Sequence, residues 1–103
     1  MNQIDVELDR LLSMSGDDEV AQALESQLDE DPENQELRFE LAAHYYKRSR
    51  WEEAIETCMD SIAIERNWNG GAANKMILEI FKELGNGNEL VIASRKKLAK
   101  LLY

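Results

Sequence analysis

Apolar residues recur three and four positions apart along most of the chain, the spacing that gathers side chains on one face of an α-helix. Short polar stretches interrupt this pattern at residues 15–18, 31–34, 47–50, 67–71 and 85–88. The interruptions leave six segments of about 12–17 residues, each long enough for a helix. We expect helices over residues 3–14, 17–29, 34–48, 51–65, 71–84 and 89–102.

Individual residues support these boundaries. Asp17 or Asp18 can cap the second helix, Pro32 cannot extend it, and Gly85 is a natural C-terminal stop for the fifth. Side chains at the apolar spacing should face the core. They are Ile4, Leu8, Leu11, Leu12, Val20, Leu24, Leu28, Leu37, Leu41, Ala42, Tyr45, Ala54, Ile55, Cys58, Met59, Ile62, Ala63, Met76, Ile77, Ile80, Phe81, Leu84, Leu90, Val91, Leu98, Leu101 and Leu102.

Short connections between helices of similar length favour antiparallel neighbours. The chain contains only one proline and five glycines, and its commonest residues enter helices at low cost. The sequence therefore predicts an all-α fold, with one domain over residues 1–103 and about six antiparallel helices in three hairpins.

The middle of the chain, residues 35–66, has Leu41, Ala42 and Tyr45 on its first expected helix and the small residue Ala54 near the start of its second. With these residues the stretch resembles one tetratricopeptide repeat, a helix–turn–helix unit of about 34 residues, which has Leu, Gly and Tyr at the first three positions and a small residue at the fourth, where two helices nearly touch. Small residues at a helix crossing allow helix axes to approach to about 8 Å. The resemblance implies a stack of helical hairpins.

Two positions depart from the repeat pattern. Arg38 replaces its Trp, and Arg66 replaces its closing Pro. The outer segments fit the pattern only loosely, as is usual for terminal units that need a polar outer face.

The charge is negative and unevenly distributed. Of a net charge of −9, residues 1–40 contribute −11 and residues 41–103 contribute +2. Such a chain repels a polyanion, so we expect no nucleic-acid binding. The acidic half is either a solvated face that keeps the protein soluble or a docking face for a basic partner.

Few residues offer chemistry. His44 is the only histidine and Cys58 the only cysteine, so we expect no metal site, no cofactor and no disulfide within the chain. A lone cysteine on an apolar stripe is expected to be buried and inert, with a mixed-disulfide thiol as the alternative. The paired acids lack a nucleophile and a base beside them, so we expect no enzyme activity. No apolar run is long enough to cross a membrane, and a soluble, cytoplasmic protein is expected.

In tetratricopeptide proteins, the first helix of each hairpin lines a concave groove. The resemblance therefore implies a protein-binding groove in the middle unit formed by Glu36, Phe39, Ala43, Tyr46 and Lys47. The alternative is that these are ordinary exposed residues of one helix. Phe39 and Tyr46 lie seven positions apart and share a helix face, and aromatic residues are enriched at interfaces.

Four features in order mark residues 20–103: ALESQLDEDPENQELRFELAAHYY at residues 23–46, the helix start at residues 51–54, Gly-Gly-Ala-Ala at residues 70–73 and ASRKKLAKLLY at residues 93–103. With these features, the stretch is similar to the C-terminal tetratricopeptide-like region of bacterial thioredoxin-fold co-chaperones, the chaperedoxins.

The resemblance implies that the chain is the C-terminal part of a longer thioredoxin-like protein of the stress response. It also implies binding of unfolded or oxidatively damaged clients, or of the chaperonin GroEL or the DnaK chaperone. Three alternatives remain: a promiscuous substrate-holding surface, a structural or dimerisation domain, and a stand-alone adaptor with no chaperone role. We expect a monomer or a weak homodimer.

Overall fold

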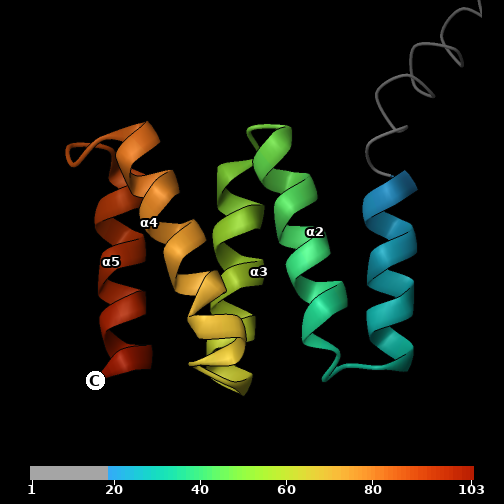
Figure 1. Ribbon diagram of the computed structural model, residues 1–103. Coiled ribbons are helices and arrows are strands. Elements are labelled where there is room, and N and C mark those ends of the chain that lie inside the picture. The colour runs from blue at the N-terminus through green and yellow to red at the C-terminus, as the bar shows by residue number, and fades with distance from the viewer. Residues whose placement is uncertain (1–18) are drawn as a thin grey trace, which may run out of the picture.

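The computed structural model describes residues 19–103, and Figure 1 shows them as helices joined by short connections. A helix over residues 19–30 comes first. It is followed by α2 (Gln35–Lys47), α3 (Trp51–Ile64), the single 3₁₀ turn η1 (Trp68–Gly70), α4 (Ala72–Leu84) and α5 (Glu89–Leu102). No strand occurs among the described residues, and the predicted all-α class is confirmed. The expected helix over residues 3–14 and the expected caps Asp17 and Asp18 lie outside the described part of the chain.

Local capping explains why two of the helices begin where they do. The side chain of Asn34 accepts a hydrogen bond from the backbone N–H of Leu37 at 3.0 Å, and Asn88 accepts one from Leu90 at 2.8 Å. Each bond satisfies a donor of the first turn that has no partner within the helix. At the C-terminal end of α4, Gly85 has φ +89°, so the predicted glycine stop is confirmed.

The turn between α2 and α3 reverses the chain without a glycine. Ser49 has φ +58°, a left-handed conformation that a side chain makes costly. The backbone N–H of Arg50 donates to the carbonyl of Tyr45 at 2.9 Å and closes the turn. The short polar break predicted at residues 47–50 is therefore a tight turn held by main-chain hydrogen bonds.

The helix α3 is the centre of the described fold. It packs against α2, α4 and α5, and successive helices in Figure 1 run in alternating directions. Ala54 is fully buried, as expected of the small residue that lets two helices approach closely. Both α2 and α4 therefore rest on the same central helix.

The core contains most of the side chains that the periodicity predicts. The buried apolar residues are Ala21, Leu24, Leu28, Leu41, Ala42, Tyr45, Ala54, Ile55, Cys58, Met59, Ile62, Ala73, Ile77, Ile80, Phe81, Val91 and Leu98. Three expected core residues are instead exposed, namely Val20, Ala63 and Leu101. Each lies within two residues of an end of its helix, where no neighbouring described element covers it.

A buried polar link ties the start of α2 to the end of α3. Gln35 Nε2 donates to the backbone carbonyl of Ser61 at 3.0 Å, and the Ser61 hydroxyl donates to Gln35 Oε1 at 2.7 Å. Both side chains are buried. Because each polar group finds a partner, the link fixes the register of the two helices without leaving an unsatisfied atom in that contact.

Candidate protein-binding groove

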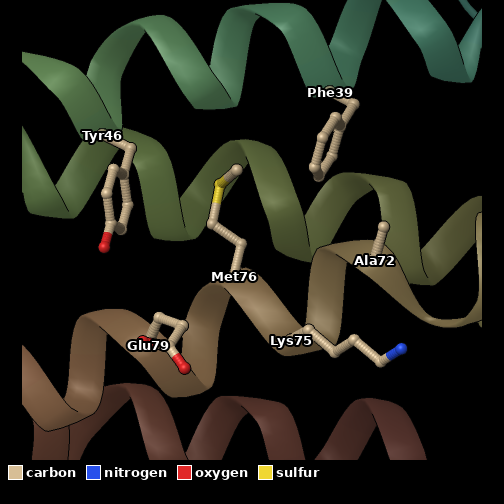
Figure 2. Close-up of a pocket in the computed structure, with 6 residues that line it drawn as sticks. All are labelled: Phe39, Tyr46, Ala72, Lys75, Met76 and Glu79. Carbon is tan, nitrogen blue, oxygen red and sulfur yellow. The ribbon is translucent and has the colours of Figure 1, made fainter.

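An open hollow lies between α2 and α4 (Figure 2). It encloses about 350 Å³, and its lining is almost entirely apolar. The lining residues are Phe39, Tyr46, Ala72, Lys75, Met76 and Glu79. Figure 2 shows Phe39 and Tyr46 pointing from α2 toward α4, and Met76 reaching from α4 into the space between the two helices. We call this the apolar hollow.

Two tryptophans buttress the aromatic side chains of α2. The rings of Phe39 and Trp68 lie 5.6 Å apart at a tilt of 53°, and those of Tyr46 and Trp51 lie 5.5 Å apart edge to face. These are favourable geometries for aromatic pairs. Phe39 and Tyr46 are only half-buried. Each ring is nevertheless held in place by a tryptophan that does not line the apolar hollow.

A second hollow adjoins the first near the N-terminal end of α2. It encloses about 480 Å³ and is lined by Glu36, Phe39, Glu40, Ala43, Trp68 and Asn69. Phe39 lines both hollows, so the two adjoin at its side chain. We call the second the acidic hollow, and the two together the α2–α4 groove.

The family model of the tetratricopeptide repeat matches residues 14–103, most of the chain. The chain belongs to the tetratricopeptide-repeat family. No curated protein and no solved structure matches it. Tetratricopeptide repeats generally mediate protein–protein interactions and are typically non-catalytic modules, and the α2–α4 groove lies between the first helices of two successive repeat hairpins.

The five groove residues suggested by the sequence lie on α2 in four different settings. Phe39 lines both hollows, Tyr46 lines the apolar hollow, and Glu36 and Ala43 line the acidic hollow. Lys47 is exposed at the last position of α2 and lines neither hollow. The structure thus brings four of the five to the α2–α4 groove, and their role in binding stays a prediction.

The sequence names groove residues on one wall only. The repeat resemblance places the first helix of each hairpin along the groove, which includes α4, but it names no residue there. In the structure, Ala72, Lys75 and Glu79 line this wall together with Met76, which the periodicity places in the core although it is half-buried at the groove.

Cys58 lies beneath the groove rather than in it. Its side chain is buried, and its Sγ lies 3.5 Å from the sulfur of Met76. Burial raises the pKa of the Cys58 thiol to about 12, so almost none is present as the reactive thiolate at neutral pH. The prediction of a buried cysteine is confirmed, and this burial argues against a mixed-disulfide role.

The remaining candidate groups take structural positions. His44 is half-buried, with its ring 6.0 Å from that of Tyr45. Within residues 19–103, no group of three or more His, Cys, Asp or Glu side chains is placed to hold a metal ion. Over the same residues, none of the helices is long and apolar enough to span a membrane.

The two departures from the repeat pattern have different surroundings. Arg66 donates a hydrogen bond to the carbonyl of Leu102 at 3.0 Å, which places a cation at the negative end of α5. Arg38 is half-buried in a hollow shared with Glu25, Asp29 and Asp60, and its Nη1 has no hydrogen-bond partner among the described residues. The arginine thus occupies the space of the repeat's Trp within acidic surroundings.

Proposed function

We propose that this chain binds polypeptide segments in the α2–α4 groove and acts as the interaction module of a thioredoxin-like co-chaperone. The observation that carries the proposal is the apolar hollow. Phe39, Tyr46 and Met76 leave apolar surface open to solvent. Covering such surface with an apolar side chain is favourable by about 25 cal/mol per Å².

The construction of the hollow favours binding over simple exposure. Trp68 and Trp51 hold the two aromatic rings before any ligand arrives, so little side-chain freedom is lost on binding. A contact confined to these two hollows is small compared with stable protein interfaces. The expected complex is therefore weak and rapidly reversible, as a handling role for many clients requires.

The co-chaperone context rests on the similarity of residues 20–103 to the C-terminal region of chaperedoxins. On this proposal, residues 1–103 are the repeat domain of a longer cytoplasmic protein. The ligands would be unfolded clients, the chaperonin GroEL or the DnaK chaperone. Lys47, exposed at the end of α2, would contact the bound segment where it leaves the groove.

A direct binding assay tests the proposal. The probes are a reduced and carboxymethylated unfolded protein, purified GroEL and purified DnaK. We compare the wild-type chain with the variant Phe39→Ala plus Tyr46→Ala. The matched control is Leu78→Ala plus Ile92→Ala, which also truncates two partly exposed apolar side chains but leaves the groove intact.

The groove variant should lose about tenfold or more in affinity for at least one probe, because interface positions whose truncation costs about 2 kcal/mol or more are enriched in aromatic residues such as Tyr. The control should bind as the wild type does. Circular dichroism at the assay temperature verifies that each variant is folded. Equal binding by the folded groove variant and the wild type would overturn the groove as the binding surface, and binding to none of the probes would overturn the co-chaperone role.

Self-association is the second candidate function, and one observation favours it. Leu78 and Ile92 are each 45% exposed, and Leu101 is 39% exposed, which leaves apolar side chains uncovered on the last hairpin. Sedimentation velocity at several concentrations measures the dimer directly. Loss of a dimer in the Leu78→Ala plus Ile92→Ala variant would support this function, and a monomer at all concentrations would exclude it.

A further inference from the structure

The acidic hollow carries negative charge that the fold does not use. Glu36 and Glu40 lie four positions apart on α2, and both are exposed. Neither side chain forms an ion pair or hydrogen bond with another residue of the described range 19–103. Like charges at this spacing destabilise a helix. Glu36 is partly compensated by its place in the first turn of α2, but Glu40 lies beyond that turn.

Aromatic rings stand beside these carboxylates. Phe39 and Trp68 form a tilted pair at the wall of the same hollow, and both rings are half-buried. The face of an aromatic ring attracts cations, and Trp does so most strongly. Carboxylates and aromatic faces in one hollow therefore favour the same kind of ligand group, a cation on a long apolar stem.

We infer that the acidic hollow receives a lysine or arginine side chain of the polypeptide bound in the α2–α4 groove, while a neighbouring apolar residue enters the apolar hollow. This inference rests on the proposed function and names the class of segment that it prefers. The methylene stem covers Phe39 and Trp68, and the charged end reaches Glu36 and Glu40. The net charge of −9 also draws basic segments toward the chain.

The opposite wall determines where the cation can go. Lys75 and Glu79 line the apolar hollow on α4, and Glu79 lies 3.8 Å from Lys82. Lys75 repels a second cation on that side, whereas the polar lining of the acidic hollow contains two carboxylates and the neutral Asn69. The basic residue of the ligand is therefore directed to the α2 side, which distinguishes this groove from one that captures an acidic segment.

The probe is a panel of nine-residue peptides whose termini are blocked so that they carry no charge. Each peptide consists of Gly and Ser with one Leu, and a variable residue stands one, two or three positions from that Leu. The variable residue is Lys, Arg, Gln or Glu. Each peptide is titrated into the ¹⁵N-labelled chain, and affinities come from chemical-shift changes. Because the chain has only two tryptophans, the indole N–H signal of Trp68 reports on the acidic hollow and that of Trp51 on the far side of Tyr46.

The Lys and Arg peptides should bind roughly three- to tenfold more tightly than the Gln peptide, the effect expected of an exposed ion pair with cation–π support. This preference should shrink at high salt, because salt screens exposed charges. The variant Glu36→Gln plus Glu40→Gln should lose the preference while still binding the Gln peptide.

The matched control is Glu52→Gln plus Glu56→Gln. These two acids are exposed, four positions apart and at the start of α3, so the change in net charge and helix position is the same but lies outside the groove. The control should keep the preference for Lys and Arg. Equal loss in both variants would show that only net charge matters and would overturn the inference.

Other outcomes separate this inference from the proposed function. Binding of all four peptides with no preference for a cation would overturn the inference and leave groove binding intact. Preference for the Glu peptide would also overturn it and point to Lys75. Absence of binding by every peptide, including the Gln peptide, would count against the proposed function itself and against the inference that rests on it.

Discussion

The buried link between Gln35 and Ser61 gives a quantitative test of how α2 is held on α3. It consists of two hydrogen bonds, one of 3.0 Å to the Ser61 carbonyl and one of 2.7 Å from the Ser61 hydroxyl. The exposed fraction is 7% for Gln35 and 2% for Ser61. Replacing one partner leaves the other buried without its hydrogen bond, which typically costs about 1–3 kcal/mol.

The two single variants should differ. Ser61→Ala leaves the buried Oε1 atom of Gln35 without its hydrogen-bond donor. We therefore expect the free energy of unfolding to fall by about 2 kcal/mol and the Tm to fall by about 10 °C. Gln35→Leu should cost less, about 1 kcal/mol, because the Ser61 hydroxyl can turn to a carbonyl of its own helix. The double variant removes both polar groups and should cost at least about 1 kcal/mol less than the sum of the singles.

Urea unfolding followed by circular dichroism measures all four proteins of this cycle, and an unchanged slope against urea verifies that the same unfolding is compared. The control is Thr57→Val. Among the residues that the structure describes, its hydroxyl bonds only to the Glu53 carbonyl one turn away in the same helix, so its loss leaves no other side chain without a partner. Single-variant losses that simply add, within about 0.3 kcal/mol, would refute a coupled link.

Four single residues give further predictions. The buried Cys58 thiol should react with a thiol reagent far more slowly in the folded protein than in urea. Because its folded pKa of about 12 exceeds the ordinary value of 9.0, its contribution to stability should be full below pH 9 and fall above it. Unfolding curves of wild type and Cys58→Ala from pH 7 to 11 test this pH dependence. Burial and the hydrogen bond to Glu25 raise the pKa of Tyr45 to about 12, so some loss above pH 10 should persist in that variant. Asn34→Ala should destabilise the protein by about 1 kcal/mol, because α2 loses its N-terminal cap. Ser49→Gly should stabilise it by about 0.5–1 kcal/mol, because glycine adopts the positive φ of this residue without strain. Thermal unfolding measures both changes.

The helix boundaries were predictable because their determinants are local. Asn34 and Asn88 cap from within two or three residues, and Gly85 ends α4 by its own backbone conformation. Periodicity also identified the core faces, including the fully buried Ala54. It failed at Val20, Ala63 and Leu101, because the pattern says which face a residue occupies but not whether a neighbouring helix extends far enough to cover it.

The groove was only half predictable for a related reason. Phe39 and Tyr46 were identifiable as an aromatic pair off the core stripe, since both lie on one helix. Met76 looked like a core residue, because a half-buried groove position and a buried one follow the same spacing. Trp68 gave no periodic signal at all, since it sits in a 3₁₀ turn whose next residue, Asn69, has φ +50°. Only the folded chain brings Met76 and Trp68 next to the side chains of α2.

The groove remains open because α3, and not a ligand, sets the separation of its two walls. Both α2 and α4 pack on α3 through buried residues, and small side chains such as Ala42, Ala54 and Ala73 allow those contacts to be close. Once these contacts are filled, Phe39, Tyr46 and Met76 are left to share the space between α2 and α4, and they do not fill it. The tryptophans that hold two of these residues come from α3 and from the turn that follows it, so the rings are positioned by the same central helix that spaces the walls. A ligand therefore meets a surface whose shape is already determined, and its binding free energy need not be used to form the groove.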